Sequence, residues 1–163
     1  MDTLHAEARS RIQAILAAGA DLTLATLRPD GYPQATTVSY VNRGLVLYAG
    51  IGLDSQKAHN VEADPRVSLT VNLPYADWGG IRGISAAATA TITNGTEELA
   101  RVAALMAHKF PEIRRMQEAG RAPDWGSVLV LRIEPKVISL LDYTLGFGHT
   151  ELYAVPPEAC AGD

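Results

Sequence analysis

The chain has 163 residues, long enough for one domain with a sizeable core, and 47% hydrophobic with 20% charged residues is a globular composition. Its net charge of −4 argues against a nucleic acid as partner, because a phosphate backbone requires a basic protein face. No apolar run approaches the roughly 18 residues of a membrane span, and the N-terminus lacks the apolar core of a signal peptide. The single cysteine, Cys160, cannot form an intrachain disulfide, so we expect a cytoplasmic protein. Because a membrane-spanning segment is also missing, we expect no association with a membrane.

The first third of the chain predicts one helix and three strands. Apolar residues at helical spacing indicate an amphipathic helix over residues 3–18, which Gly19 would end. Residues 21–28 alternate between apolar and polar side chains, and residues 33–41 and 45–51 are also rich in strand formers. Because only short turns connect these three strands, we expect them to be antiparallel neighbours in one sheet.

The rest of the chain predicts further strands with helices between them. In chain order these elements are a helix over residues 55–63, a strand over 66–73, a loop over 74–83, a strand over 84–94, helices over 96–110 and 112–120, and a strand over 127–143 that bends or breaks near Pro135. Thr96 is the expected N-cap of the longer helix. Six or so hairpin-linked strands close best as a small barrel, which removes their edges. We therefore expect a mainly β, antiparallel barrel with peripheral helices, as a single domain over residues 1–153 with a flexible tail over residues 154–163.

Two segments indicate contact with a ligand or a second subunit. The strand over residues 84–94 consists mostly of small side chains, which allow another backbone or a ligand to approach closely. Trp78 lies in a glycine-rich loop, where we expect its large ring to be buried against a partner or a ligand. A bulky substitution such as Ala88→Trp would test whether this strand faces a partner.

The segment "GIGLDSQKAH" raises the question of a phosphate site. Gly50 and Gly52 follow a strand and precede a helix, which is half of a dinucleotide-binding fingerprint. Ser55 occupies the position of the third glycine, and the preceding strands form hairpins rather than further βαβ units. The pattern therefore does not favour a Rossmann fold.

The start of the same helix offers a simpler anion site. The first amides of a helix have no intrahelical partner, and the helix dipole places a partial positive charge there. Ser55 adds a hydroxyl, and Lys57 lies in the first turn, where a cation is unfavourable unless an anion compensates it. The alternative is that Asp54 caps the helix and that Lys57 is simply solvated. The residues alone leave both interpretations open.

No other pattern in the sequence identifies a chemical centre. The four histidines are not at ligand spacing from one another, so we expect no metal site. No nucleophile elbow or Cys/His pair is present, so no residue is assigned a catalytic role. His149, in the glycine-flanked loop "GFGHTE", is retained as a candidate for ligand contact.

Three stretches together resemble the pyridoxamine 5′-phosphate oxidase-like family of FMN-binding split barrels. They are "LATLRPDGYPQATTVSYV", "LVLYAG" and "SQKAHNVEADPRVSLTV", and the last combines an S-x-K-x-x-N motif with D-P-R-V-S. The resemblance covers roughly residues 21–143. It implies a six-stranded antiparallel split β-barrel that forms a homodimer, with FMN at the interface between the subunits.

The resemblance also implies which residues contact the cofactor. It favours the anion interpretation, because the family holds the FMN phosphate at the short helix, here with Ser55, Gln56 and Lys57. The residues implied to lie along the flavin ring and the ribityl chain, or close by, are Thr36, Thr37, Val38, Ser39, Tyr48 and Ala49. Trp78 completes the set of candidate cofactor-binding residues.

The sequence differs from the pyridoxamine 5′-phosphate oxidases that give this family its name. Those oxidases carry a basic R-x-H element that binds the substrate phosphate, whereas this chain reads "LDYTLGFGHTELY" with no arginine beside His149. The strand "QATTVS" also lacks the arginine usual in those oxidases. We therefore expect an FMN-dependent oxidoreductase that acts on another small molecule. The alternative is a non-catalytic protein that binds a flavin, a deazaflavin or haem in the same barrel.

Overall fold

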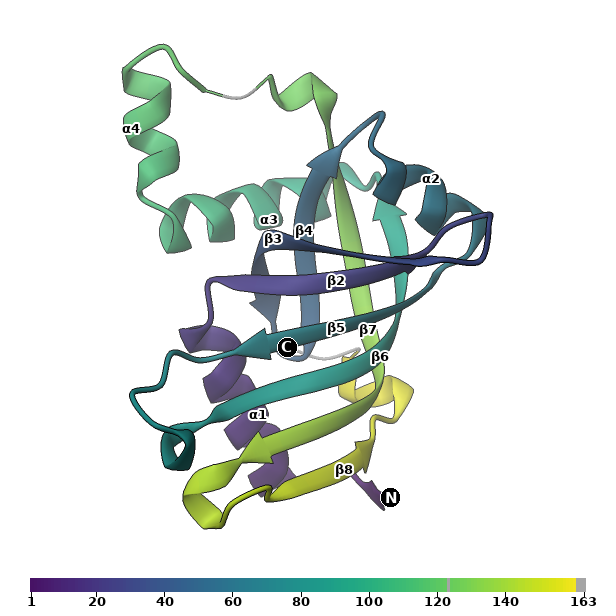
Figure 1. The fold of residues 1–163 in the computed structure, drawn as a ribbon. Helices are drawn as coiled ribbons and strands as arrows, with labels where there is room; N and C mark the ends of the chain where they lie inside the picture. Colours follow the sequence, from purple (N-terminus) through teal and green to yellow (C-terminus); the bar gives the residue numbers. More distant parts are fainter. Residues whose placement is uncertain (123, 161–163) are drawn as a thin grey trace.

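The framework of the protein is a closed antiparallel barrel of six strands. A computed structural model describes residues 1–122 and 124–160. The barrel strands are β2 (Asp21–Leu27), β3 (Pro33–Arg43), β4 (Val46–Gly52), β5 (Arg66–Asn72), β6 (Arg82–Thr93) and β7 (Val128–Asp142). They follow one another in the order β7-β4-β3-β2-β5-β6, and pairing of β6 with β7 closes the barrel (Figure 1). The predicted six-stranded, mainly β fold is confirmed.

Helices and two further strands surround the barrel. The helices are α1 (Ala6–Ala18), α2 (Gln56–Ala63), α3 (Thr96–Lys109) and α4 (Glu112–Glu118), and four short 3-10 helices are η1 (Trp78–Gly80), η2 (Trp125–Ser127), η3 (Tyr143–Leu145) and η4 (Pro157–Cys160). Strand β8 (Thr150–Ala154) pairs with β7, and the short β1 (Asp2–Thr3) pairs with β8. In the described part of the chain, no helix combines the length and the apolar character that crossing a bilayer requires.

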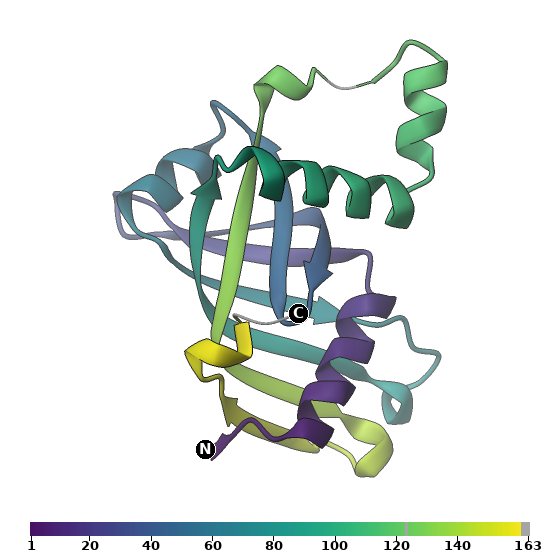
Figure 2. The same cartoon turned by 180° about the vertical axis from the view of Figure 1, so that it is seen from behind.

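The core lies inside the barrel and is closed at one end by α1. On β2, Leu22 and Leu24 are buried while Thr23 between them is exposed, as the two-residue period of a strand requires. Helix α1 lies against the barrel, as the ribbon seen from behind shows (Figure 2). Its Ile12 and Leu16 side chains are fully buried in the same core. The periodicities read from the sequence therefore correspond to one continuous hydrophobic core.

Strand β7 is continuous across the predicted break at Pro135. Pro135 faces Ala88 and Val137 faces Ala87, so Lys136 has no partner on β6 and forms a bulge. A bulge adds one residue to one strand and bends it locally. The strand therefore accommodates the proline by an irregular register rather than by ending there.

Several predicted boundaries are wrong. Strand β8 was not predicted, and the expected domain boundary at residue 153 falls inside it. Val155 is buried in the core, so the packed structure extends beyond that boundary.

The starts of two helices also differ from the prediction. Gly95, not Thr96, is the N-cap of α3. Helix α1 starts at Ala6 because the His5 Nδ1 accepts a hydrogen bond from the Ala8 amide at 3.3 Å. Residues 161–163 of the expected flexible tail lie outside the described residues.

A polar cluster joins α1 to the β7–β8 hairpin. Arg11 donates hydrogen bonds to Glu151 at 2.8 Å and to Asp142 at 3.2 Å. Tyr153 donates to Glu151, and the His149 Nε2 lies 2.8 Å from the same carboxylate. These contacts, led by the bond from Tyr153, lower the pKa of Glu151 to about 2. The cluster therefore fixes the N-terminal helix by charge as well as by packing.

Glu151→Gln should destabilise the protein near neutral pH by about 1.5 kcal/mol, the lower end for a hydrogen bond to a charged group, since the carboxylate is partly exposed. A carboxylate whose folded-state pKa is lowered stabilises the native state above its ordinary pKa of 4.5, and this contribution is lost as the pH falls from 4.5 to about 2. Urea midpoints of the two proteins should therefore differ clearly near pH 7 and little near pH 2. An undiminished difference in acid would contradict this role.

Candidate functional site

Strands β3 and β4 separate along most of their length and leave a split in the barrel wall. Residues 33–39 of β3 pair with β2, but β3 pairs with β4 only through residues 40–43. Beyond Ala49, β4 continues along β7 alone. The two strands therefore diverge after a short common segment, as the ribbon shows (Figure 1).

The edge of β3 that faces this split carries unpaired backbone groups. Hydrogen bonding alternates along an antiparallel strand, and the Tyr40 amide donates to the Ala20 carbonyl, on the β2 side. By the same alternation, the amides and carbonyls of Ala35, Thr37 and Ser39 face the split. No strand within residues 1–122 and 124–160 pairs with them there. This edge therefore offers a row of donors and acceptors to a ligand.

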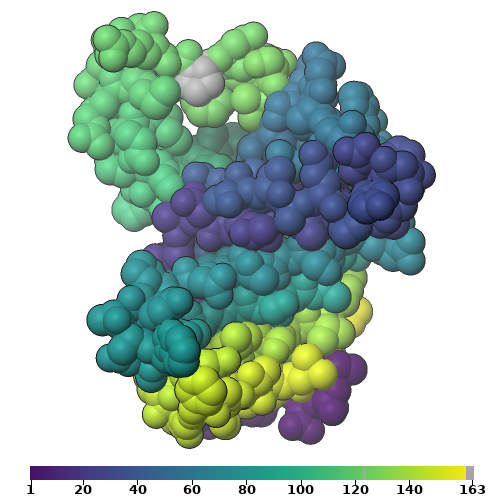
Figure 3. Space-filling view, in the orientation of Figure 1, coloured from purple at the N-terminus to yellow at the C-terminus, as the bar shows by residue number. Residues whose placement is uncertain are grey.

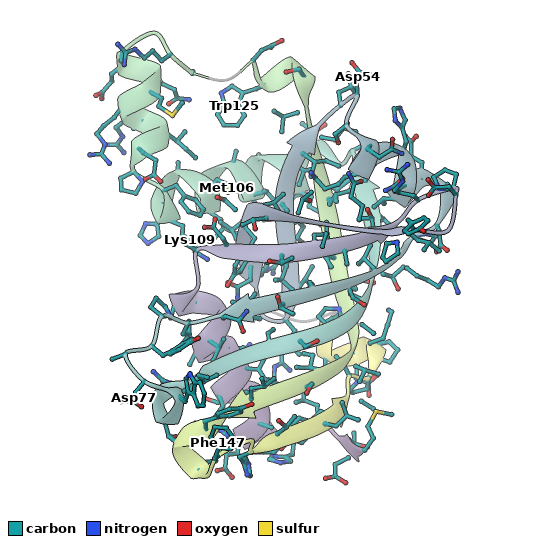
Figure 4. The ribbon with its side chains drawn as sticks, viewed as in Figure 1. Asp54, Asp77, Met106, Lys109, Trp125 and Phe147 are labelled. Atoms are coloured by element: carbon teal, nitrogen blue, oxygen red, sulfur yellow. The ribbon has the colours of Figure 1, made fainter. Side chains whose placement is uncertain are left out.

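Helix α2 begins at the end of β4 and lies beside the split. Its N-cap is Ser55, whose Oγ accepts a hydrogen bond from the Ala58 amide at 3.3 Å. The alternative in which Asp54 caps the helix is therefore wrong, and Asp54 is exposed (Figure 4). Lys57 is half-buried and, among the residues that the structure describes, has no ion-pair partner. The first turn of α2 thus combines free amides with a cation and a hydroxyl.

A buried hydrogen-bond network fixes α2 against the barrel. Asn60 is fully buried, and its Nδ2 donates to Thr26 Oγ1 at 2.9 Å and to Gln34 Oε1 at 3.3 Å. Its Oδ1 accepts a hydrogen bond from the Gln56 Nε2 at 2.8 Å. Asn60 is the last residue of the S-x-K-x-x-N motif, but the sequence alone indicates no role for it. The motif therefore contains a positioning residue as well as the candidate phosphate ligands.

Asn60→Ala should lower the free energy of unfolding by about 1–3 kcal/mol, because it leaves the buried Thr26 hydroxyl without its partner. His59→Ala removes an exposed side chain from the same helix and should change the stability by no more than about 0.5 kcal/mol. Urea denaturation without ligand measures both values. Equal effects of the two substitutions would show that Asn60 does not anchor the helix.

The predicted residues on β3 divide between the two faces of the strand. Thr36 and Val38 point inward, and Thr36 Oγ1 is a buried oxygen with no hydrogen-bond partner in the described part of the chain. Thr37 and Ser39 are exposed on the outer face, and Ser39 donates to Asp21 Oδ1 at 2.8 Å. Residues 36–39 therefore border the split mainly with their backbone.

The two predicted residues on β4 turn their side chains away from the split. Ala49 is fully buried in the barrel core. Tyr48 points toward α3, where its hydroxyl donates to Glu98 at 2.8 Å and accepts from Arg132 at 2.9 Å. Burial, followed by the bond to Glu98, raises the pKa of this tyrosine. Only the backbone of these two residues is therefore available to a ligand in the split.

The two candidates from the loops lie at the opposite end of the barrel from α2. Trp78 is 69% exposed, and its ring centroid is 6.2 Å from that of Phe147. Figure 4 shows Asp77 and Phe147 at the end remote from Asp54. His149 belongs to the Glu151 cluster described above. Neither Trp78 nor His149 joins Ser55, Gln56 and Lys57 within one chain.

In the described residues, no three His, Cys, Asp or Glu side chains come together in an arrangement that could hold a metal ion.

Comparison with known proteins supports the fold. A haem-binding protein from Mycobacterium smegmatis has a TM-score of 0.76 and 22% identity, over 98% of this chain and 62% of its own length. A conserved hypothetical protein from Mycobacterium tuberculosis has a TM-score of 0.71 and 26% identity, over 92% of this chain and 93% of its own. HutZ, a haem storage protein from Vibrio cholerae, has a TM-score of 0.62 and 19% identity, over 89% of this chain and 92% of its own length. A search of curated proteins found no significant match.

The sequence itself identifies the family. The model of the family described as pyridoxamine 5′-phosphate oxidase matches residues 8–142. This segment contains all six barrel strands and the helix that borders the split. The chain therefore belongs to the pyridoxamine 5′-phosphate oxidase family.

Proposed function

We propose that the protein binds FMN in the split between β3 and β4 and acts as a flavin-dependent oxidoreductase on a small molecule. The observation that carries this proposal is the hydrogen bond from Asn60 to Gln34, which places α2, with Lys57 in its first turn, beside the start of the unpaired β3 edge. FMN has a terminal phosphate and a ring whose edge alternates donors and acceptors. The first turn of α2 suits the phosphate, and the unpaired β3 edge suits the ring, so both parts of one ligand find matching groups.

The first turn of α2 suits the phosphate. Its amides and the helix dipole favour an anion. The Ser55 oxygen accepts from the Ala58 amide, and its hydroxyl hydrogen remains able to donate to a phosphate oxygen. Lys57 supplies the charge. In our proposal these groups bind the phosphate and Asn60 positions them through the fixed helix.

The β3 edge suits the polar rim of the ring. The backbone groups of Ala35, Thr37 and Ser39 would orient it, and the unpartnered Thr36 hydroxyl lies on the inner side of the same strand. Bound FMN would supply hydride or electron transfer, while the chain supplies binding and orientation. We assign no side chain of the split a role in proton transfer.

Haem is the second candidate, because the haem-binding protein from Mycobacterium smegmatis and HutZ share this fold. Haem iron requires an axial ligand such as histidine, cysteine, methionine or tyrosine. Tyr48 is the one such residue among our candidate cofactor-binding residues, but its side chain points away from the split and its hydroxyl is hydrogen-bonded to Glu98 and Arg132. The groups at the split therefore favour a phosphate-bearing flavin.

We further propose a homodimer that contacts itself through the outer face of the sheet. Ala35, Ala25, Ser68 and Ala87 lie in register across β3, β2, β5 and β6, and small side chains let a second backbone approach. A two-fold interface uses each patch twice. Because β3 borders the split, this contact would place partner residues next to the cofactor. Ala88 is buried in the core, so Ala87 is the position that tests the interface.

An absorbance titration tests the proposed function. The protein is incubated separately with FMN, a deazaflavin and haem, then freed of excess ligand by gel filtration. We expect the flavin spectrum to remain with the protein after incubation with FMN. Retention of haem alone would favour haem binding, and retention of none of the three would contradict a cofactor in the split. Consumption of a nicotinamide donor by the FMN-loaded protein then separates an oxidoreductase from a flavin-binding protein without activity.

A further inference from the structure

A cavity lies between α3, α4 and η2 on the outer side of β4 and β7. Its volume is about 430 Å³. Leu99, Val102, Met106, Ile113, Trp125 and Val130 form much of its wall. The space-filling view shows the molecule hollowed here, with α3 visible below α4 (Figure 3).

The cavity exists because α4 stands away from the barrel. Helix α4 has no buried residue, so its inner face is not packed into the core. Gly50 forms part of the cavity floor, and a Cβ at this position would meet Val128 Cγ1 at 3.3 Å. Trp125 is 49% exposed, and its ring extends into the space above Met106 (Figure 4). Large apolar surface is thus left open to water in a concave position.

The chemistry of the wall defines the kind of ligand. Among the described residues that line the cavity none is charged, and the polar groups there are the Gln117 amide and the Trp125 indole N–H. An ionised group would lose its hydration here without a partner, which is costly. The volume lies in the range of roughly 300–1,000 Å³ that small-molecule sites occupy. Trp125 offers a flat face on which a ring can stack.

We infer that this cavity binds an uncharged, apolar, ring-bearing small molecule. Burial of the exposed Trp125 and of the apolar helix faces drives the binding, and the Gln117 amide supplies one hydrogen bond that orients the ligand. Gly50 lies on β4, which also borders the split, so the ligand would lie close to the proposed cofactor. A role for this ligand as the substrate rests on the proposed function, whereas binding in the cavity does not.

The test uses the uncharged dye N-phenyl-1-naphthylamine, whose fluorescence rises in apolar surroundings, added to the protein without FMN. Ala103 lines the cavity and Ala100 does not, and both are exposed on α3. We expect saturable dye binding that Ala103→Glu weakens at least tenfold and Ala100→Glu leaves unchanged. Tryptophan excitation should transfer energy to the bound dye, and Trp125→Leu should reduce that transfer far more than Trp78→Leu.

Two results would overturn the inference. One is dye fluorescence that does not saturate or that responds equally to both glutamate variants. The other is a shift from dimer to monomer with Ala103→Glu in sedimentation, because a second copy of the chain would then fill the cavity. Lys57→Ala should leave dye binding intact. Failure of FMN binding with normal dye binding would therefore reject the proposed function alone.

Discussion

Lys57→Ala should weaken FMN binding roughly tenfold to a hundredfold while leaving the fold intact. A charge-assisted hydrogen bond to phosphate contributes about 1.5–3 kcal/mol, and each 1.4 kcal/mol is about a factor of ten in affinity. Lys57 has no ion pair in the described part of the chain, so its removal breaks no internal ion pair. Quenching of flavin fluorescence during titration gives the dissociation constant.

Two controls separate loss of the phosphate contact from indirect damage. Riboflavin has no phosphate, so its affinity should be nearly the same for the wild type and for Lys57→Ala. Arg121→Ala removes the same charge from an exposed position after α4 and should leave FMN affinity unchanged. If Lys57→Ala binds FMN as tightly as the wild type, Lys57 is simply solvated and the phosphate site lies elsewhere.

Ala87→Trp should dissociate the proposed homodimer and lower FMN affinity together with assembly. Ala87 is exposed on β6, in register with Ser68 on β5, at one end of the row of small residues that crosses the sheet. An indole at this position would hold the two sheets apart, and the two-fold relation would place it in the interface twice. Sedimentation with and without FMN measures assembly, and the flavin titration measures affinity at the same protein concentrations.

The matched control is Ala100→Trp, which adds the same ring to an exposed position on α3 outside the proposed interface. It should change neither assembly nor FMN binding. Ala88→Trp is not equivalent, because Ala88 is buried and a tryptophan there would overpack the core. A monomeric Ala87→Trp variant that keeps full FMN affinity would refute the shared pocket and place the whole site within one barrel.

Much of the fold could be predicted because local patterns in the sequence indicate its strands and helices. The two-residue alternation of β2 and the helical spacing of α1 correspond directly to the buried Leu22, Leu24, Ile12 and Leu16. Boundaries that depend on tertiary contacts could not be predicted. Strand β8 forms because β7 continues beyond its pairing with β4 and offers a free edge there, and no local pattern in "HTELYAV" indicates that edge.

The candidate site was predicted in part for the same reason. The sequence places Ser55, Gln56 and Lys57 in the first turn of a helix, since helix termini follow from local spacing and from Pro65 after the helix. It does not show that Ser55, rather than Asp54, is the N-cap, because capping depends on the backbone path out of β4. The role of Asn60 depends on Thr26 and Gln34, two residues that are distant in the sequence.

The sequence by itself determined most of the strand and helix pattern, the family and the phosphate-binding candidates, because these depend on residue types at short, fixed spacings. The tertiary structure alone decided which groups meet. It turns the side chains of Tyr48 and Ala49 away from the split, separates Trp78 from Lys57, and opens the uncharged cavity beneath α4. Register and the divergence of β3 from β4 set these relations, and both result from contacts between strands that lie far apart along the chain.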